Sequence, residues 1–140
     1  MNIEVCSNRE DAMKVVRGLN TFNEEQQSRL VQEDWIPVEF IVRNENAEIK
    51  GGILGGIGYY GGLEIRILWV SKELRGQGVG RALLARAEAF AQSNGAAKVM
   101  LDTFSFQAKE FYEKCGYHCI GSVPDFPITG QARHYFYKDL

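Results

Sequence analysis

Apolar residues recur at helical spacing in two stretches of the second half of the chain. The first stripe predicts a helix of about 13 residues that begins near Val79, and it contains Val79, Leu83, Leu84, Ala87, Phe90 and Ala91. Asn94-Gly95 ends this helix, because glycine readily adopts the left-handed conformation that follows a helix. The second stripe predicts a shorter helix that stops at Gly116, and it contains Ala108, Phe111, Tyr112 and Cys115.

Six further segments have the alternation or the composition of strands. In Pro37–Arg43 every second residue is apolar, and Leu63–Val70 is rich in β-branched residues. Ile49–Tyr60 is apolar but contains many glycines, since seven of the 15 glycines lie between Gly51 and Gly62. It is therefore predicted as a strand or hairpin with close packing. The other predicted strands are Val99–Leu101, Tyr117–Val123 and Arg133–Tyr137.

The N-terminal region predicts one short strand and two helices. Ile3–Val5 is the strand, and Ser7 with Glu10 forms a capping box for a helix that runs to about residue 18. Thr21–Glu24 repeats the capping pattern, which predicts a second, shorter helix ending near Gln32.

The order of elements is β-α-α-β-β-β-α-β-α-β-β, which predicts an α+β fold with a mixed sheet flanked by helices. The helix that begins near Val79 connects the strand Leu63–Val70 to the strand Val99–Leu101. A crossover of this kind makes the two strands parallel. No linker, repeat or low-complexity segment divides the chain, so residues 1–140 are expected to form a single domain.

Composition and charge narrow the function classes. Sixteen Lys and Arg against 18 Asp and Glu give a net charge of −2, which argues against a non-specific nucleic-acid binder. No apolar run reaches roughly 20 residues, and no basic segment precedes an apolar run at the N-terminus. Neither a membrane partner nor a secretory signal is therefore expected, and the expected compartment is the cytoplasm. Three cysteines without metal-ligand spacing predict reduced thiols and no metal site: Cys6, Cys115 and Cys119.

The loop that holds Gly76, Gly78 and Gly80 lies between a predicted strand and a predicted helix. Without side chains, successive amide N–H groups can converge on one anion, and the helix N-terminus adds unpaired N–H groups. From Lys72 to Arg86, four cationic residues and one anionic residue give a local charge of +3. The expected ligand is a pyrophosphate, and the alternative is a glycine-rich turn without a ligand. The spacing fits neither the G-x-G-x-x-G fingerprint nor a Walker loop, which disfavours other nucleotide-binding domains.

The same loop carries a family resemblance. Arg75-x-x-Gly78-x-Gly80 matches the Arg/Gln-x-x-Gly-x-Gly/Ala signature of the GNAT acetyltransferase superfamily. Downstream, Ala108 is followed by Tyr112 and then by Gly116-Tyr117, as in the second part of the GNAT pattern. The resemblance spans roughly Leu63 to Tyr117.

The resemblance implies that acetyl-CoA lies in a V-shaped gap where two central parallel strands, Leu63–Val70 and Lys98–Thr103, splay apart. Its pyrophosphate would sit on the amides of Gly76 to Gly80, and its pantetheine arm would pair with the backbone of Leu68 to Val70. A backbone amide near the end of that strand would face the acetyl carbonyl. Ser105 stands where many members carry an Asn that contacts the cofactor. The implied cofactor-binding residues are Leu68, Trp69, Val70, Arg75, Gly76, Gln77, Gly78, Val79, Gly80, Arg81, Ser105 and Tyr112.

The implied reaction is direct transfer of an acetyl group from acetyl-CoA to a primary amine of a small molecule or peptide. The alternative is a non-catalytic CoA-binding sensor or interaction module on the same fold. Tyr112 is the candidate proton donor to the departing thiolate, since the family places a tyrosine there near the cofactor sulfur. Its alternative role is core packing, which Phe111 could also fill.

Glu64 is the candidate base, 11 residues before Arg75, where some family members carry a catalytic Glu. In a regular strand it shares one face with Leu68 and Val70. The alternatives are a surface pair with Arg66 and a reaction that uses ordered water. Asp102 either faces the cleft or caps a turn, and His118 and His134 are expected to be structural or exposed.

The resemblance implies that the acceptor enters opposite CoA, between Phe22–Trp35 and Val123–Arg133. The first segment has an acidic and aromatic composition that would suit a cationic amine, and the alternative is a solvated helix face. The identity of the acceptor and the oligomeric state, including a homodimer, stay open. The residues that would form this wall are Glu24, Glu25, Glu33, Asp34 and Trp35.

Overall fold

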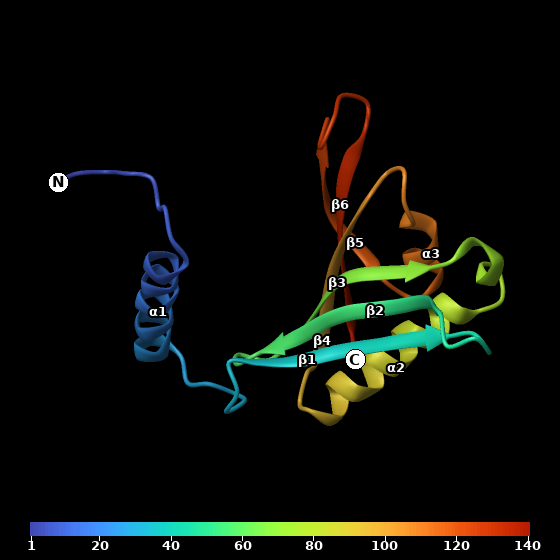
Figure 1. The fold of residues 1–140 in the computed structure, drawn as a ribbon, viewed down its shortest axis with the longest axis horizontal. Coiled ribbons are helices and arrows are strands. Elements are labelled where there is room, and N and C mark those ends of the chain that lie inside the picture. The colour runs from blue at the N-terminus through green and yellow to red at the C-terminus, as the bar shows by residue number, and fades with distance from the viewer.

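A single six-stranded mixed sheet organises the chain (Figure 1), and the computed structural model describes all of residues 1–140. The strand order is β1-β2-β3-β4-β6-β5, with three α-helices and one short 3₁₀ helix, so the predicted fold class is confirmed. The strands are β1 Trp35–Arg43, β2 Ile49–Gly58, β3 Leu63–Val70, β4 Lys98–Phe104, β5 His118–Pro124 and β6 Ala132–Asp139. The helices are α1 Arg9–Gln26, α2 Val79–Ser93 and α3 Lys109–Lys114, and the 3₁₀ helix is η1 Lys72–Leu74.

The central strands β3 and β4 are parallel and separate after a short contact. Their register contains two pairs, Leu63 with Val99 and Glu64 with Met100. Every other pair of neighbouring strands is antiparallel. The later part of β3 therefore has no ladder partner on its β4 side, as the predicted splay requires.

The core lies between the sheet and α2. This helix packs on β1, β2 and β3, and four of the six residues in its apolar stripe are buried: Leu83, Leu84, Ala87 and Ala91. Tyr112 of α3 packs beside Phe136 of β6, with ring centroids 6.1 Å apart. The largest fully buried side chains are Phe136, Ile53, Ile57, Leu63, Leu84, Val38 and Val99.

A β-bulge interrupts β3 and changes which side chains share a face of the strand with Glu64. Gly55 of β2 pairs with Ile65, whereas the preceding residue, Leu54, pairs with Ile67, so Arg66 is the extra residue. One extra residue reverses the alternation of side chains beyond it. Leu68 and Val70 consequently pack against the core, and Glu64 shares the opposite, exposed face with Ile67 and Trp69. The prediction that Glu64 shares a face with Leu68 and Val70 is wrong.

The N-terminal elements also differ from the prediction. Residues 3–5 form no strand, and Asn8 rather than Ser7 is the N-cap, since its Oδ1 accepts the amide of Asp11 at 2.8 Å. One continuous helix, α1, replaces the predicted pair and ends at Gln26. No proline interrupts the backbone ladder around residues 18–24, so a second capping pattern alone does not end the helix.

Helix α1 stands apart from the sheet at the left of Figure 1. It has no buried residue, and Val15, Leu19 and Phe22 are exposed. The segment that follows it is attached to the β2–β3 turn, because the amides of residues 30 and 31 both donate to the carbonyl of Tyr59. None of the helices is long and apolar enough to cross a membrane.

Candidate active site

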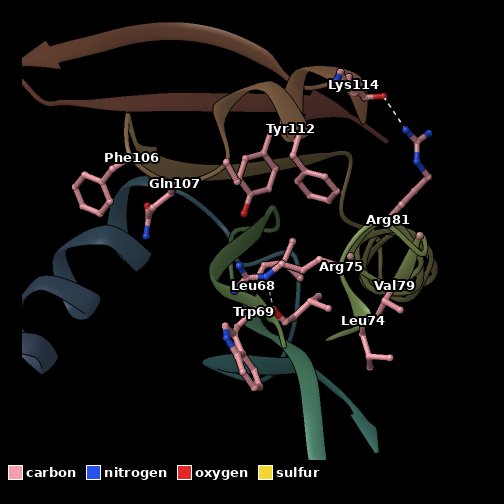
Figure 2. Close-up of a pocket in the computed structure, with 16 residues that line it drawn as sticks. Leu68, Trp69, Leu74, Arg75, Val79, Arg81, Phe106, Gln107, Tyr112 and Lys114 are labelled. Atoms are coloured by element: carbon pink, nitrogen blue, oxygen red, sulfur yellow. Dashed lines mark hydrogen bonds between the residues drawn. The ribbon is translucent and has the colours of Figure 1, made fainter. Parts of the chain in front are cut away.

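A pocket of about 890 Å³ opens where β3 and β4 separate (Figure 2). Its volume falls in the range of small-molecule and cofactor sites. Its walls come from the end of β3, the glycine loop with the start of α2, and α3 with the turn before it. The lining residues are Leu68, Trp69, Val70, Leu74, Arg75, Gly76, Gly78, Val79, Gly80, Arg81, Phe106, Gln107, Ala108, Phe111, Tyr112 and Lys114.

The glycine loop presents backbone amides at one end of this pocket. Gly76 and Gly78 have φ angles of +74° and +81°, a region that residues with a side chain rarely occupy. Gly78 is also the N-cap of α2 and offers no side chain to the first-turn N–H groups, which remain available to an anion. At Gly80, an added β-carbon would lie 3.1 Å from the ring of Phe111, so glycine allows α3 to approach α2 closely.

The same end of the pocket is cationic. Arg75, Arg81 and Lys114 line it, and no Asp or Glu is among the lining residues. The Arg81 guanidinium donates to the backbone carbonyl of Lys114 at 3.4 Å, which leaves its charge uncompensated by a carboxylate. Amide donors and unpaired positive charges together suit a polyanionic phosphate group.

Tyr112 lies at the other side of the gap, facing β3. The residue is 7% exposed, and burial raises the pKa of its hydroxyl to about 12. Its ring is held by Phe111, Tyr117 and Phe136, with centroids 5.3, 5.8 and 6.1 Å away. The hydroxyl makes no hydrogen bond within the protein, and Figure 2 shows it pointing into the pocket toward Leu68. Tyr112 therefore presents a neutral, fixed hydroxyl to the pocket at neutral pH.

Two of the predicted cofactor-binding residues lie outside this pocket. The side chain of Gln77 turns back and donates to the carbonyl of Glu73 at 2.7 Å. Ser105 lines a neighbouring hollow with Lys109 and His134. The other ten line the pocket itself. Six further residues line the pocket that were not predicted as site residues, although two of them, Ala108 and Phe111, lie on the predicted helical stripe. These six are Leu74, Phe106, Gln107, Ala108, Phe111 and Lys114.

His134 is connected rather than isolated. Its Nε2 lies 3.1 Å from the hydroxyl of Ser105, and its Nδ1 lies 2.6 Å from the hydroxyl of Ser122. Ser105 also accepts the amide of Ala132 at 3.0 Å. These contacts support the structural role expected for His134, and they tie the Ser105 turn to β5 and β6.

The candidate carboxylates are paired with arginines. Glu64 is exposed and lies 3.8 Å from Arg66, whose guanidinium stacks 4.3 Å from the Trp35 ring centroid. Asp102 accepts two hydrogen bonds from Arg133, at 2.8 and 2.9 Å, so this carboxylate holds β4 to β6. No cluster of three His, Cys, Asp or Glu side chains comes together as a metal site.

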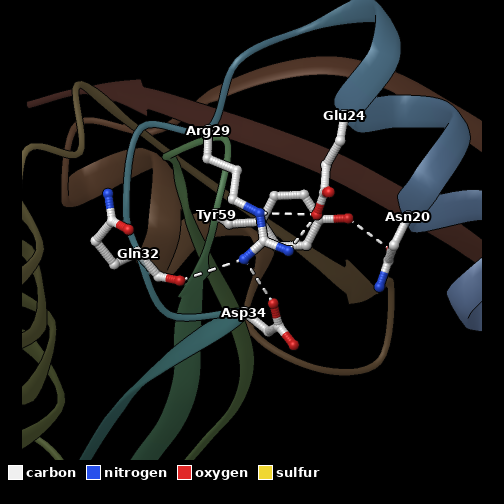
Figure 3. A network of polar contacts seen from close by, with 6 residues as sticks. All are labelled: Asn20, Glu24, Arg29, Gln32, Asp34 and Tyr59. Atoms are coloured by element: carbon white, nitrogen blue, oxygen red, sulfur yellow. Dashed lines mark hydrogen bonds and ion pairs between the residues drawn. The ribbon is translucent and has the colours of Figure 1, made fainter.

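Two of the four acids in the wall predicted near residues 24–35 are paired with one arginine (Figure 3). Arg29 forms ion pairs with Glu24 and with Asp34, the latter at 2.8 Å, and it donates to the carbonyl of Gln32. Its guanidinium also stacks 4.4 Å from the centroid of Tyr59. The arrangement serves to fix the end of α1 against the β2–β3 turn, which gives two of these acids a structural role.

Splayed parallel strands, a glycine loop at a helix N-terminus and a tyrosine facing the gap define a small acyltransferase-type domain. The chain belongs to the acetyltransferase (GNAT) family, whose model matches residues 9–117. The resemblance seen in the sequence is confirmed, and the chain is an N-acetyltransferase.

Relatives of known identity agree with this assignment. The chain is 38% identical over 97 residues to blasticidin-S acetyltransferase from Streptomyces morookaense. The aligned region covers 69% of this chain and 70% of the relative. An acetyltransferase from Bacillus cereus ATCC 14579 matches with a TM-score of 0.89 and 35% identity, over 100% of this chain and 98% of the other. A Bacillus anthracis protein described as a streptothricin acetyltransferase was solved with acetyl coenzyme A. It matches at 25% identity and a TM-score of 0.65, over 78% of this chain and 64% of that protein.

Proposed function

We propose that this protein transfers an acetyl group from acetyl-CoA directly to a primary amine of a small molecule. The observation that carries the proposal is one continuous pocket that joins the loop amides at Gly76–Gly80 to the free hydroxyl of Tyr112. Its relatives support a small-molecule acceptor, since they include proteins named for antibiotics.

The residues at the pocket's cationic end fit a nucleotide pyrophosphate. The amides of the glycine loop and the first turn of α2 would hold the phosphate oxygens, and Arg75, Arg81 and Lys114 would balance the charge. Beyond Glu64, the backbone of β3 lacks ladder hydrogen bonds to β4. This free edge would pair with the amide groups of the pantetheine arm in the manner of an added strand.

Tyr112 acts as the general acid in this proposal. Acetyl-CoA supplies a thioester whose leaving group is a thiolate, and ordinary thiols have a pKa near 8.5. The buried phenol keeps its proton at pH 7, and its hydroxyl points at the part of β3 along which the arm would lie. It therefore donates a hydrogen bond to the departing sulfur. The proton that the sulfur takes from the phenol is replaced from solvent, because a phenolate with a pKa of about 12 is a stronger base than the thiolate. The Cys115 thiol beside it is no nucleophile, because burial raises its pKa.

Glu64 receives the proton that the amine loses. An alkylamine with a pKa near 10 is mostly protonated at pH 7 and must lose that proton before attack. Glu64 and Trp69 lie on the same exposed face, but Glu64 is about 13 Å along β3 from Leu68 at the ordinary rise of a strand. Proton transfer consequently runs through water, and the competing proposal is that water alone accepts the proton.

The experiment that tests this function measures thiol release from acetyl-CoA with a panel of amines, including polyamines, aminoglycosides, amino acids and N-terminal peptides. The proposal expects release that depends on at least one small amine and a product heavier by one acetyl group. Tight CoA binding without amine-dependent release from any amine would contradict it.

A further inference from the structure

Three phenylalanines form an exposed aromatic cluster beside the active-site pocket. The rings of Phe104 and Phe106 stack with centroids 5.3 Å apart and planes 20° apart. Phe126 follows, with its centroid 6.2 Å from that of Phe104. Phe106 is 60% exposed and Phe126 is 43% exposed, although burial of such rings is normally favourable. An exposed cluster of this kind marks a surface that a ligand can cover.

The cluster reaches into the pocket at the end away from the phosphate loop. Phe106 lines the pocket, and so does Trp69, which is 48% exposed on the outer face of β3. Figure 2 shows Phe106 on the side of Tyr112 away from Arg81 and Lys114, and Trp69 across the gap from Tyr112. Two open aromatic side chains therefore border the approach to the Tyr112 hydroxyl.

The charged side chains near the aromatic cluster do not favour an acceptor with several positive charges. The carboxylates of Glu64 and Asp102 are each engaged by an arginine, and Glu24 and Asp34 share Arg29. Arg133 also stacks near Phe104 and Phe126, with its guanidinium carbon 5.8 and 5.7 Å from their centroids. A second positive charge beside the aromatic cluster would meet Arg133, because the two unpaired acids of the predicted wall, Glu25 and Glu33, do not line the pocket.

We propose that the acceptor is a monoamine attached to a planar aromatic or heteroaromatic ring, which stacks on the exposed ring of Phe106 at the edge of the pocket that Trp69 also lines. This inference rests on the proposed function and names its substrate class. Ring faces carry negative charge and ring edges positive charge, so aromatic groups recognise one another beyond their apolar area. The stacked Phe104 supports Phe106 from behind and fixes its orientation, which reduces the entropy lost on binding.

The kinetic test compares three acceptors in the acetyl-CoA thiol-release assay: 2-phenylethylamine, its saturated counterpart 2-cyclohexylethylamine, and spermidine. We expect kcat/KM to favour the aromatic amine over the saturated one by roughly five- to tenfold. Phe106→Leu keeps an apolar side chain and should erase that preference. Ile41→Ala is the control, since Ile41 is a large apolar side chain, 50% exposed on β1, outside the pocket and outside both predicted acceptor segments.

A binding measurement separates this inference from the proposed function. Ligand-observed NMR with CoA present should show 2-phenylethylamine bound to the wild type and weakened in Phe106→Leu. Equal binding or equal kcat/KM for the ring and saturated amines, or a preference for spermidine, would overturn the inference while leaving the acetyltransferase proposal intact. A change in sedimentation for Phe106→Leu without loss of ring preference would also overturn the inference, since the cluster would then be a protein interface.

Binding of 2-phenylethylamine without thiol release from acetyl-CoA would overturn the proposed function alone.

Discussion

The Nε of Arg75 donates to the carbonyl oxygen of Val70 at 3.0 Å. This hydrogen bond ties the glycine loop to the last residue of β3. The proposal assigns two backbone surfaces to coenzyme A: the amides of the glycine loop and the free edge of β3. The Arg75–Val70 hydrogen bond fixes the spacing between them. The guanidinium also lines the pocket and adds positive charge there.

Replacing Arg75 with Met removes both the hydrogen bond to Val70 and the positive charge but keeps an unbranched side chain. We expect the Kd for CoA to rise by roughly tenfold or more, since hydrogen bonds to charged groups contribute about 1.5–3 kcal/mol. Calorimetric titration measures the Kd. Arg43→Met is the control, because Arg43 also donates to a backbone carbonyl, that of Ala47, in a turn outside the pocket. Similar CoA affinity in the two variants would remove Arg75 from the binding site.

Tyr112→Phe should lower kcat by roughly tenfold or more, because a positioned general acid contributes about 10²- to 10⁴-fold. The Kd for CoA should stay near that of the wild type, since the ring remains to pack against Phe136. Tyr117→Phe serves as the comparison: Tyr117 donates to Glu88 at 2.8 Å and is buried, so its loss should lower stability and spare turnover. An unchanged kcat in Tyr112→Phe would exclude it as the acid.

Glu64→Gln tests the proposed proton acceptor through the pH dependence of kcat/KM. If Glu64 accepts the proton, the acidic limb of the profile should shift or flatten, because that limb reports the essential base. Glu39→Gln is the matched control, since Glu39 is an exposed carboxylate on β1. An acidic limb identical in the wild type and both variants would favour water as the acceptor.

The free energy of unfolding should fall steeply between pH 10 and pH 12. Tyr112 has a pKa of about 12 in the folded protein, whereas an exposed phenol titrates near 10. Below pH 10 the phenol is neutral in both states. From there to pH 12 only the unfolded chain ionises, which costs the fold about 2–3 kcal/mol. Urea denaturation at several pH values measures this loss. The loss of unfolding free energy should be smaller in Tyr112→Phe than in the wild type. Equal losses in the wild type and the variant would contradict the burial of the Tyr112 hydroxyl.

The sequence predicted the elements whose signals are local. The boundaries of β3 and the two ends of α2 are correct, because a β-branched run and a 3.6-residue stripe ending at Asn94-Gly95 need no distant partner. The glycine loop was found for the same reason. The separation of β3 and β4 was expected from the family resemblance, and the register confirms it.

The features that were missed depend on contacts between distant segments. The bulge at Arg66 exists because β3 pairs with a glycine of β2: an added β-carbon at Gly55 would lie 2.2 Å from the carbonyl oxygen of Glu64. His134 contacts Ser105 across 29 residues of sequence, and Phe106 reaches the pocket through the turn after β4. Side-chain periodicity within one segment carries no information about such pairings.

A calorimetric titration of CoA into the wild type, Gly78→Ala and Gly121→Ala tests for a phosphate site on the glycine loop. Gly78 has a φ of +81° at the start of α2, where a side chain costs about 1–2 kcal/mol, whereas Gly121 lies in open space on β5 without a positive φ. We expect one CoA per chain in the wild type, equal affinity in Gly121→Ala, and affinity weaker by roughly tenfold in Gly78→Ala. No heat at millimolar CoA, or unchanged affinity in Gly78→Ala, would contradict a phosphate site on this loop.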